Sequence, residues 1–274
     1  MPAPDVLQDR TYRPEDPVTA RADALEQLYV AFDGVPFDAA MPRHSPTVTN
    51  EDLAALSGPV RSLPPSLVAR FVLKAGTTWG GPDDIRRVAP RALDLAAAQQ
   101  LPLDRGLLWA KLRWAGWPDW PTYQVTTIRE FLRAEWACLL RSAPRPAHVA
   151  HRWLRPTADG IADLTPFFDE WHDALSPITP HPHRRAATGH LVLLMSNSPL
   201  RPDFPATVAE LFPGNAPAAA QLTTWLTGPG TSHVLEEAAR ALADTTDARR
   251  VTVAHERLRR FQAAVARTHQ PDPF

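Results

Sequence analysis

The sequence contains a single cysteine, Cys138, among its 274 residues. One cysteine cannot form a disulfide within the chain, and it excludes a zinc site made of several thiolates. Long apolar runs are missing too. The apolar run at 191–195, for example, has only five residues, whereas a helix that crosses a bilayer needs roughly 20. Residues 1–11 carry neither a basic nor an apolar segment, so a signal peptide is not expected. These absences predict a soluble protein of the reducing cytoplasm with no membrane contact.

A surplus of charge of either sign is also absent. The chain has 29 basic and 30 acidic residues, a formal net charge of −1, so no global field attracts nucleic acid, and a nucleic-acid partner is not expected. Lysine is nearly missing, with only Lys74 and Lys111, and arginine supplies the other basic side chains. Together with abundant alanine and proline, this bias is typical of a GC-rich genome. We therefore interpret it as codon usage rather than as recognition of phosphate by guanidinium groups.

Proline, by contrast, is abundant, and its positions indicate where helices begin. Many of the 30 prolines precede apolar patterns of helical period, where proline is tolerated because the first helical residue needs no N–H donor. The sequence therefore predicts an all-α fold of about twelve short helices without a β-hairpin. We expect a single compact domain over 16–269, with a flexible arm at 1–15 and a tail at 270–274. Irregular helix pairs resembling an α-solenoid are an alternative arrangement.

Capping residues, prolines and glycines set the expected helix boundaries. The helices are expected at 17–32, 49–57, 65–75, 82–100, 104–115, 122–141, 146–154, 158–163, 166–175, 203–211, 216–226, 232–244 and 247–268. Pro90 is expected to kink or split the helix at 82–100. The proline-rich residues 176–183 are expected to form an extended loop and a sub-boundary of the domain. Residues 189–196 could be a strand, but a buried helix is favoured because a lone strand would have no partner.

Tryptophan is the most concentrated chemical feature. Five of the nine tryptophans lie within the segment from Trp109 to Trp136, and two of them, Trp117 and Trp120, flank Asp119 in a turn between helices. Indoles at such a turn could form a stacking platform for a sugar, a base or a proline-rich peptide. An aromatic cluster that packs at a helix corner explains the same residues, and we favour this structural interpretation.

A second candidate site is the turn in which Trp79 precedes a Gly-Gly pair and Asp83 and Asp84 begin the next helix. Free N–H groups at a helix N-terminus can hold an anion, but the two carboxylates would repel a phosphate, and no Walker lysine follows. The carboxylates could instead hold a divalent metal if further acidic ligands faced them. A favourable interaction with the helix dipole is the simpler explanation.

The remaining candidates carry weaker signals. His148 and His151 have a spacing that can place two imidazoles on one helix face, yet no ligand motif accompanies them. We interpret them as solvent-exposed and expect no metal and no cofactor. Cys138 is expected to be a small buried residue. The arginines of the helix at 247–268 could hold an acidic partner, although a solvated helix face is favoured.

Two functions from different classes are compatible with these observations. The favoured hypothesis is a cytoplasmic helical scaffold or protein-interaction protein, whose partner is another protein, because helices are plentiful and catalytic signatures are missing. The alternative is a helical enzyme or small-ligand-binding protein with a pocket near the Trp-rich segment 109–120 and the turn at 79–84. A deep pocket would favour the alternative, and a shallow groove would favour the scaffold.

Overall fold

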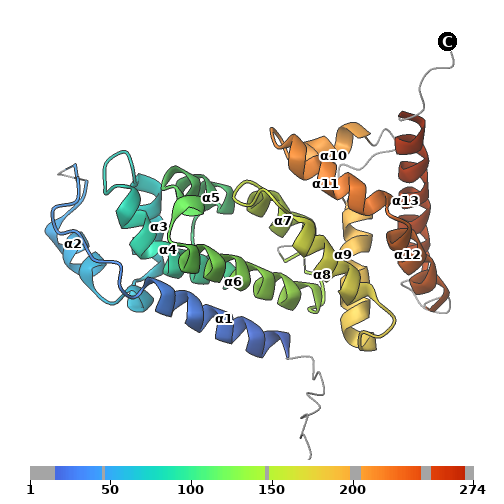
Figure 1. Ribbon diagram of the computed structural model, residues 1–274, viewed down its shortest axis with the longest axis horizontal. Helices are drawn as coiled ribbons and strands as arrows, with labels where there is room; N and C mark the ends of the chain where they lie inside the picture. Colours follow the sequence, from blue (N-terminus) through green and yellow to red (C-terminus); the bar gives the residue numbers. More distant parts are fainter. Residues whose placement is uncertain (1–15, 45–46, 146–147, 198–204, 242–247, 269–274) are drawn as a thin grey trace, which may run out of the picture.

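The structure, a computed structural model, describes residues 16–44, 47–145, 148–197, 205–241 and 248–268. These residues form α-helices and two short 3₁₀ turns, and no strand (Figure 1). The helices in chain order are α1 (Pro17–Phe32), α2 (Asn50–Ser57), η1 (Val60–Ser62), α3 (Pro65–Lys74), α4 (Pro82–Ala97), α5 (Arg105–Trp114), η2 (Trp117–Asp119), α6 (Thr122–Leu140), α7 (Ala150–Ala158), α8 (Thr165–Leu175), α9 (His181–Asn197), α10 (Pro205–Leu211), α11 (Ala216–Thr227), α12 (Pro229–Ala241) and α13 (Ala248–Thr268). The predicted all-α fold is confirmed, with thirteen α-helices in the described ranges where about twelve helices were expected.

Side-chain caps begin several helices where the sequence predicted them. Thr49 and Asp52 cap α2 reciprocally, each side chain accepting the other residue's backbone N–H at 3.1 Å, which is the capping-box arrangement. Asp104 accepts a backbone N–H of the first turn of α5 at 3.1 Å. Gly116 follows α5 with a φ of +70°, a left-handed conformation that glycine adopts without strain. Thr246, which precedes the helix expected at 247–268, lies outside the described residues.

The helix predicted at 158–163 is wrong. Helix α7 ends at Ala158, and the chain then turns, with the N–H of Gly160 bonded to the carbonyl oxygen of Thr157 at 2.9 Å. A Cβ at position 160 would lie 2.1 Å from the ring of Trp109 on α5. The turn is therefore held in direct contact with a helix that is distant in sequence, and local periodicity does not reveal such a contact.

Two boundaries near prolines also differ from the prediction. The loop expected at 176–183 is shorter, because α9 begins at His181 and includes Pro182 in its first turn, where proline is tolerated. Helix α7 begins at Ala150 rather than at 146. Residues 189–196 lie within α9, so the favoured helical assignment is confirmed.

Helix α4 runs without a break through Pro90, so the expected split does not occur. Proline removes one hydrogen bond from a helix interior and crowds the preceding turn. Pro90 is buried, and Ala89 and Leu93 beside it are 1% and 3% exposed. Tertiary packing on both sides of the missing hydrogen bond stabilises the helix.

The helices follow one another along an elongated molecule (Figure 1). α1 packs along α6, and α12 pairs with α13 at the end of the molecule opposite α2. Helix α9 contacts α6, α7, α8 and α13, so it joins the central helices to the C-terminal pair. One cluster of buried apolar side chains extends from Leu28 to Phe261. None of the described helices combines the length and apolarity that crossing a lipid bilayer requires.

Trp136 on α6 occupies the centre of this cluster. Its side chain is 0% exposed, and its Nε1 donates a hydrogen bond of 2.7 Å to the carbonyl oxygen of Phe167. The rings of Trp153 and Trp171 lie 5.0 and 5.5 Å away, between ring centroids. The indole thereby ties α6 to α7 and α8.

Candidate functional site

Two tryptophans predicted as binding residues lie inside the protein. Trp79 and Trp117 are 1% and 2% exposed. Each packs against another ring, Trp79 edge-on to Phe71 at 5.2 Å and Trp117 tilted against Trp109 at 5.9 Å, between centroids. Both side chains therefore contribute to the core, and a binding role for them stays a prediction.

The third predicted tryptophan, Trp120, is half-buried. Its Nε1 donates to the carbonyl oxygen of Ala115 at 3.0 Å, and its ring packs edge-on against Phe32 at 5.7 Å. Asp119 beside it is exposed to solvent. The most exposed indole of the segment is that of Trp114, at 46%, which was not singled out from the sequence.

The predicted acidic pair is divided between two environments. Asp84 is 8% exposed, and its carboxylate accepts the N–H of Gly81 at 2.8 Å. Burial raises the pKa of Asp84, and the hydrogen bond from Gly81 opposes that rise. Asp83 is exposed. Asp84 therefore acts as a cap of α4, and the two carboxylates do not share one setting.

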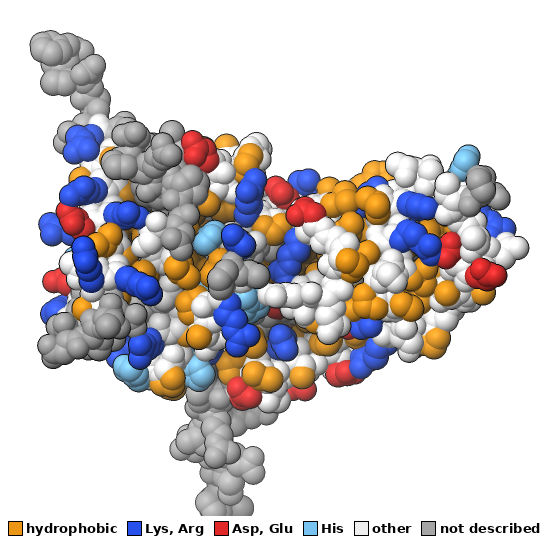
Figure 2. Space-filling view, turned by 180° about the vertical axis from the view of Figure 1, so that it is seen from behind, with side chains coloured by type: hydrophobic (Ala, Val, Ile, Leu, Met, Phe, Trp, Pro, Cys, Tyr) orange, Lys and Arg blue, Asp and Glu red, His pale blue; other side chains and the backbone are white. Residues whose placement is uncertain are grey.

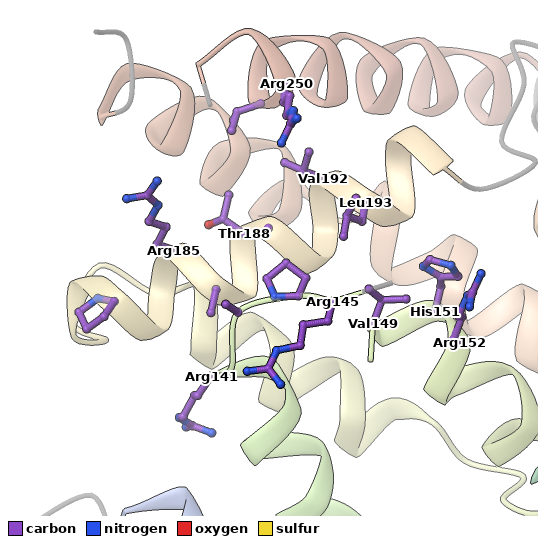
Figure 3. A pocket seen from close by; sticks show the side chains of 16 residues that line it. Arg141, Arg145, Val149, His151, Arg152, Arg185, Thr188, Val192, Leu193 and Arg250 are labelled. Atoms are coloured by element: carbon purple, nitrogen blue, oxygen red, sulfur yellow. The ribbon is translucent and has the colours of Figure 1, made fainter. Parts of the chain in front are cut away.

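A cavity of about 810 Å³ lies elsewhere, between the connection from α6 to α7, the helix α9 and the start of α13 (Figure 3). Its size is within the range of about 300 to 1,000 Å³ that is typical of small-molecule sites. Arg145 and Val149 come from the connection, and His151 and Arg152 from the first turn of α7. We call this the arginine cavity.

Buried His190 holds two walls of the arginine cavity together. The residue lies on α9 and is 0% exposed. Its Nε2 lies 2.9 and 3.0 Å from the carbonyl oxygens of Leu139 and Ser142, and its Nδ1 accepts the N–H of Ala150 at 3.3 Å. Two carbonyl acceptors place the proton on Nε2. Burial lowers the pKa of His190 to about 4, so the ring is neutral at physiological pH.

The connection from α6 to α7 lies close against α9. Gly189 faces Pro144, and a Cβ at position 189 would lie only 3.1 Å from the proline Cγ. Arg145 and His148 exchange backbone hydrogen bonds of 3.3 and 2.8 Å, which fixes the bend of the connection. The wall is therefore shaped by backbone contacts, and the arginine side chains project from a defined frame.

Positive charge dominates the arginine cavity. Of its sixteen lining residues five are arginines and one is histidine, and no Asp or Glu of the described chain lines it. The basic residues are Arg141, Arg145, Arg152, Arg185, Arg250 and His151. They surround the cavity rather than meet at one point, with Arg250 on α13 above it and Arg145 below it in Figure 3. Basic side chains also outnumber acidic ones over the half that carries α12 and α13, at the left of Figure 2.

Three of these arginines are available to a ligand. Arg141 forms an ion pair of 2.7 Å with Glu170. The guanidinium groups of Arg145, Arg152 and Arg250 form no ion pair or hydrogen bond with any other residue that the structure describes. Helix α7 also begins at this wall without a side-chain cap, and the positive end of a helix dipole favours an anion. The electrostatics of the cavity therefore favour negative charge.

The two histidines of this region are partly buried, so their interpretation as solvent-exposed residues is wrong. Nδ1 of His151 is closed to solvent and has no hydrogen-bond partner among the described residues. Burial lowers the pKa of His151, and the charge of Arg152 lowers it further. His148 pairs through Nδ1 with Nε2 of Gln99 at 2.8 Å, and burial lowers its pKa as well. Neither imidazole adds a full positive charge near pH 7.

The remaining wall of the arginine cavity is apolar. Val149, Val192 and Val251 are 3%, 6% and 3% exposed, and Leu193 lies beside them (Figure 3). Apolar walls with a few polar groups are the usual composition of a small-molecule site. The cavity thus presents cations around an apolar surface.

A second, smaller cavity of about 270 Å³ shares Val149 and Arg152 with the first. Its other arginine, Arg105, lies 3.0 Å from a carboxylate oxygen of Glu135. Positive charge in this smaller cavity is therefore largely neutralised, which sets it apart from the arginine cavity.

The arginine cavity was not predicted from the sequence, although a signal was present. Residues 142–158 and 174–202 contain no Asp or Glu, and these two acid-free segments supply facing walls. Arg250 was noted only within the basic surplus of the last helix, and His151 only as a metal candidate. The general interpretation of arginine as codon usage hid the uneven distribution of acidic residues.

Among the described residues, no three His, Cys, Asp or Glu side chains gather closely enough to hold a metal ion. Cys138 is half-buried in α6, more accessible than its apolar neighbours suggested. No protein-family model, no curated protein and no solved structure matches this chain.

Proposed function

We propose that this protein is a non-catalytic binding protein that holds an anionic organic molecule in the arginine cavity. The observation that carries the proposal is the set of three guanidinium groups, Arg145, Arg152 and Arg250, that line a cavity to which the described residues contribute no Asp or Glu. Guanidinium groups form strong, charge-assisted hydrogen bonds with carboxylates, sulfonates and phosphates. An anion would therefore gain contacts here that the described chain does not provide for itself.

Binding is favoured over catalysis because the described lining residues place no nucleophile beside His151, the one acid-base group among them. The described lining residues include no Ser, Cys, Asp or Glu. The hydroxyl of Thr188 donates to the carbonyl oxygen of Arg184 at 2.9 Å, and His151 has no nucleophile beside it. A nucleophile and a base within hydrogen-bond reach are the minimum for covalent catalysis.

This proposal belongs to the small-ligand class that was the alternative from the sequence, at a different place from 79–84 and 109–120. The cytoplasmic scaffold that binds another protein stays a separate prediction. It requires a protein partner, whereas the proposal here requires only a soluble anion.

The proposal can be tested with 2-naphthalenesulfonate, an aromatic anion, by isothermal titration calorimetry at low salt. We expect one molecule to bind per chain. Arg152→Gln and Arg250→Gln should each weaken binding about fivefold to tenfold, or about 1 to 1.4 kcal/mol. Binding should also weaken as salt is raised, because both arginines are exposed at the rim and salt screens exposed charges.

Matched controls are available on the same helices. Arg155→Gln removes an exposed charge from α7, and Arg249→Gln removes one from α13, and neither residue lines the cavity. These variants should bind like the unmodified protein. Equal weakening in all four variants would mean that the anion responds to general surface charge, and the proposed site would be abandoned.

A further inference from the structure

The arginine cavity carries more positive charge than a singly charged ligand can neutralise. Arg145, Arg152 and Arg250 contribute three charges from three separate segments, the connection from α6 to α7, helix α7 and helix α13. The two remaining arginines, Arg141 and Arg185, each have a partner elsewhere. A monocarboxylate has one charge and two oxygens, which a single guanidinium can satisfy in a bidentate pair. Two cations would then remain unmatched.

A phosphate monoester matches this arrangement better. At pH 7 it carries a charge of about −1.5 to −2 and presents three strong acceptor oxygens. Its larger charge is attracted by all the guanidinium groups around the cavity, because electrostatic attraction does not require them to meet at one point. No Asp or Glu of the described chain lines the cavity to repel it.

The cavity is too large and too apolar for the phosphate group alone. Its volume of about 810 Å³ far exceeds that of an inorganic ion. Val149, Val192 and Val251 form a buried apolar surface between the basic side chains. Such a surface gains free energy from contact with an apolar group, because water is released from both.

From these observations we infer that the ligand is an organic phosphate, in which a phosphate monoester bound by the rim arginines is attached to an apolar body that lies on the valines. This inference rests on the proposed function and names the chemical class of the anion. The phosphate could be carried by a soluble metabolite or by a lipid headgroup, and both present the same group to the arginines.

Four naphthalene compounds with the same apolar body test the inference: 2-naphthyl phosphate, 2-naphthalenesulfonate, 2-naphthoate and 2-naphthol. Calorimetric titration of the full chain at pH 7.5 should give the tightest binding for the phosphate, about tenfold tighter than the sulfonate and the carboxylate. The sulfonate has three oxygens but one charge, so it separates the effect of charge from that of oxygen number. The neutral naphthol should bind weakest.

The variant Arg152→Gln/Arg250→Gln should reduce the preference for phosphate over sulfonate to within about twofold, since the charge that distinguishes the two is removed. The variant Arg155→Gln/Arg249→Gln should retain the full preference. Sulfonate or carboxylate binding at least as tightly as phosphate, with the same dependence on the two arginines, would overturn the inference and leave the proposed function standing. Failure of all four compounds to bind would overturn both.

Sedimentation with vesicles distinguishes the two sources of phosphate. Phosphatidic acid carries a phosphate monoester, so vesicles that contain it should pull down the protein if the natural source is a lipid, and pure phosphatidylcholine vesicles should not. Sedimentation that depends on Arg152 and Arg250 would support the inference with a lipid source. Tight binding of naphthyl phosphate without sedimentation would support it with a soluble source.

Discussion

The tryptophan-rich segment 109–120 and the arginine cavity differ in what their side chains contact. In the first region, Trp117 lies in the core against Trp109, and Trp120 donates its N–H to a backbone carbonyl. In the second region, three guanidinium groups line a cavity and have no partner in the described parts of the chain. The most prominent sequence feature therefore serves the fold, whereas the candidate site is built from residues that looked ordinary in the sequence.

The same contrast appears among the arginines alone. Arg61 forms two hydrogen bonds with Glu26, of 2.6 and 2.8 Å, and Arg91 pairs with Asp94 at 2.7 Å. Arg61 and Arg91 thus have carboxylate partners, whereas Arg145, Arg152 and Arg250 have none among the described residues. These three side chains are exposed at the cavity rim, so a ligand can reach them without first breaking an ion pair with a described residue.

The largest expected effect tests the tryptophan side of this comparison. Trp117→Ala should lower the free energy of unfolding by about 3 to 5 kcal/mol, because the indole is 2% exposed and its removal leaves a cavity beside Trp109. Trp114→Ala is the matched control, since Trp114 is 46% exposed and should cost less than about 1 kcal/mol. Urea denaturation measures both. A midpoint unchanged by Trp117→Ala would return this tryptophan to the list of binding residues.

The second effect compares a partnered arginine with an unpartnered one. Arg87 is 8% exposed and donates to the carbonyl oxygens of Leu56 and Gly58 at 2.7 and 2.8 Å, at the end of α2. Arg87→Met should lower the free energy of unfolding by about 2 to 3 kcal/mol, because it leaves those acceptors unpaired. Arg152→Met should change it by no more than about 0.5 kcal/mol. Similar losses in both variants, measured by chemical denaturation, would remove the distinction between the two groups of arginines.

The third effect concerns pH and the frame of the arginine cavity. The pKa of His190 is lowered by burial from 6.5 to about 4, so the unfolded chain binds a proton more readily than the folded one. Its contribution to stability is present above pH 6.5 and is lost as pH falls toward 4, with a loss of about 2 kcal/mol by pH 5. His148 and His151 have pKa values lowered in the same direction.

The measurement is the urea midpoint between pH 7.5 and pH 5, for the unmodified chain and for His190→Gln. Glutamine keeps a hydrogen-bond donor and does not titrate, so the variant should be less stable at pH 7.5 but should depend less on pH. An identical pH dependence of the two proteins would show that the protonation of His190 is not coupled to folding.

The fold could be predicted in large part because local signals act within single helices. The capping residue Asp16, together with Pro17 and the stop residue Gly34, predicts a helix at 17–32, and α1 spans these residues in the structure. Thr49 and Asp104 likewise predict the starts of α2 and α5, and each side chain accepts a backbone N–H of the helix that follows it. The prediction failed at 158–163, where Gly160 turns the chain because Trp109 occupies the space of a side chain. That contact joins residues about 50 positions apart and has no local signature.

The candidate site could not be predicted from periodicity, since its parts are local only in space. Arg145, Arg152 and Arg250 span more than 100 positions of the chain, and α9 brings them around one cavity. The distribution of acidic residues along the chain could have indicated the site, whereas helical periodicity could not. The segments 142–158 and 174–202 contain no Asp or Glu. Where these segments pack together, neither supplies a carboxylate that could neutralise the arginines of the other.

Arg152 lies in the walls of both cavities, and this shared wall makes their occupancies interdependent. A guanidinium that turns toward an anion in the larger cavity is withdrawn from the smaller one, where His148 and Arg105 remain. Thermodynamic linkage then requires that a ligand in either cavity change the affinity of the other by the same factor. Arg152 is the side chain that would transmit this coupling if each cavity held a ligand.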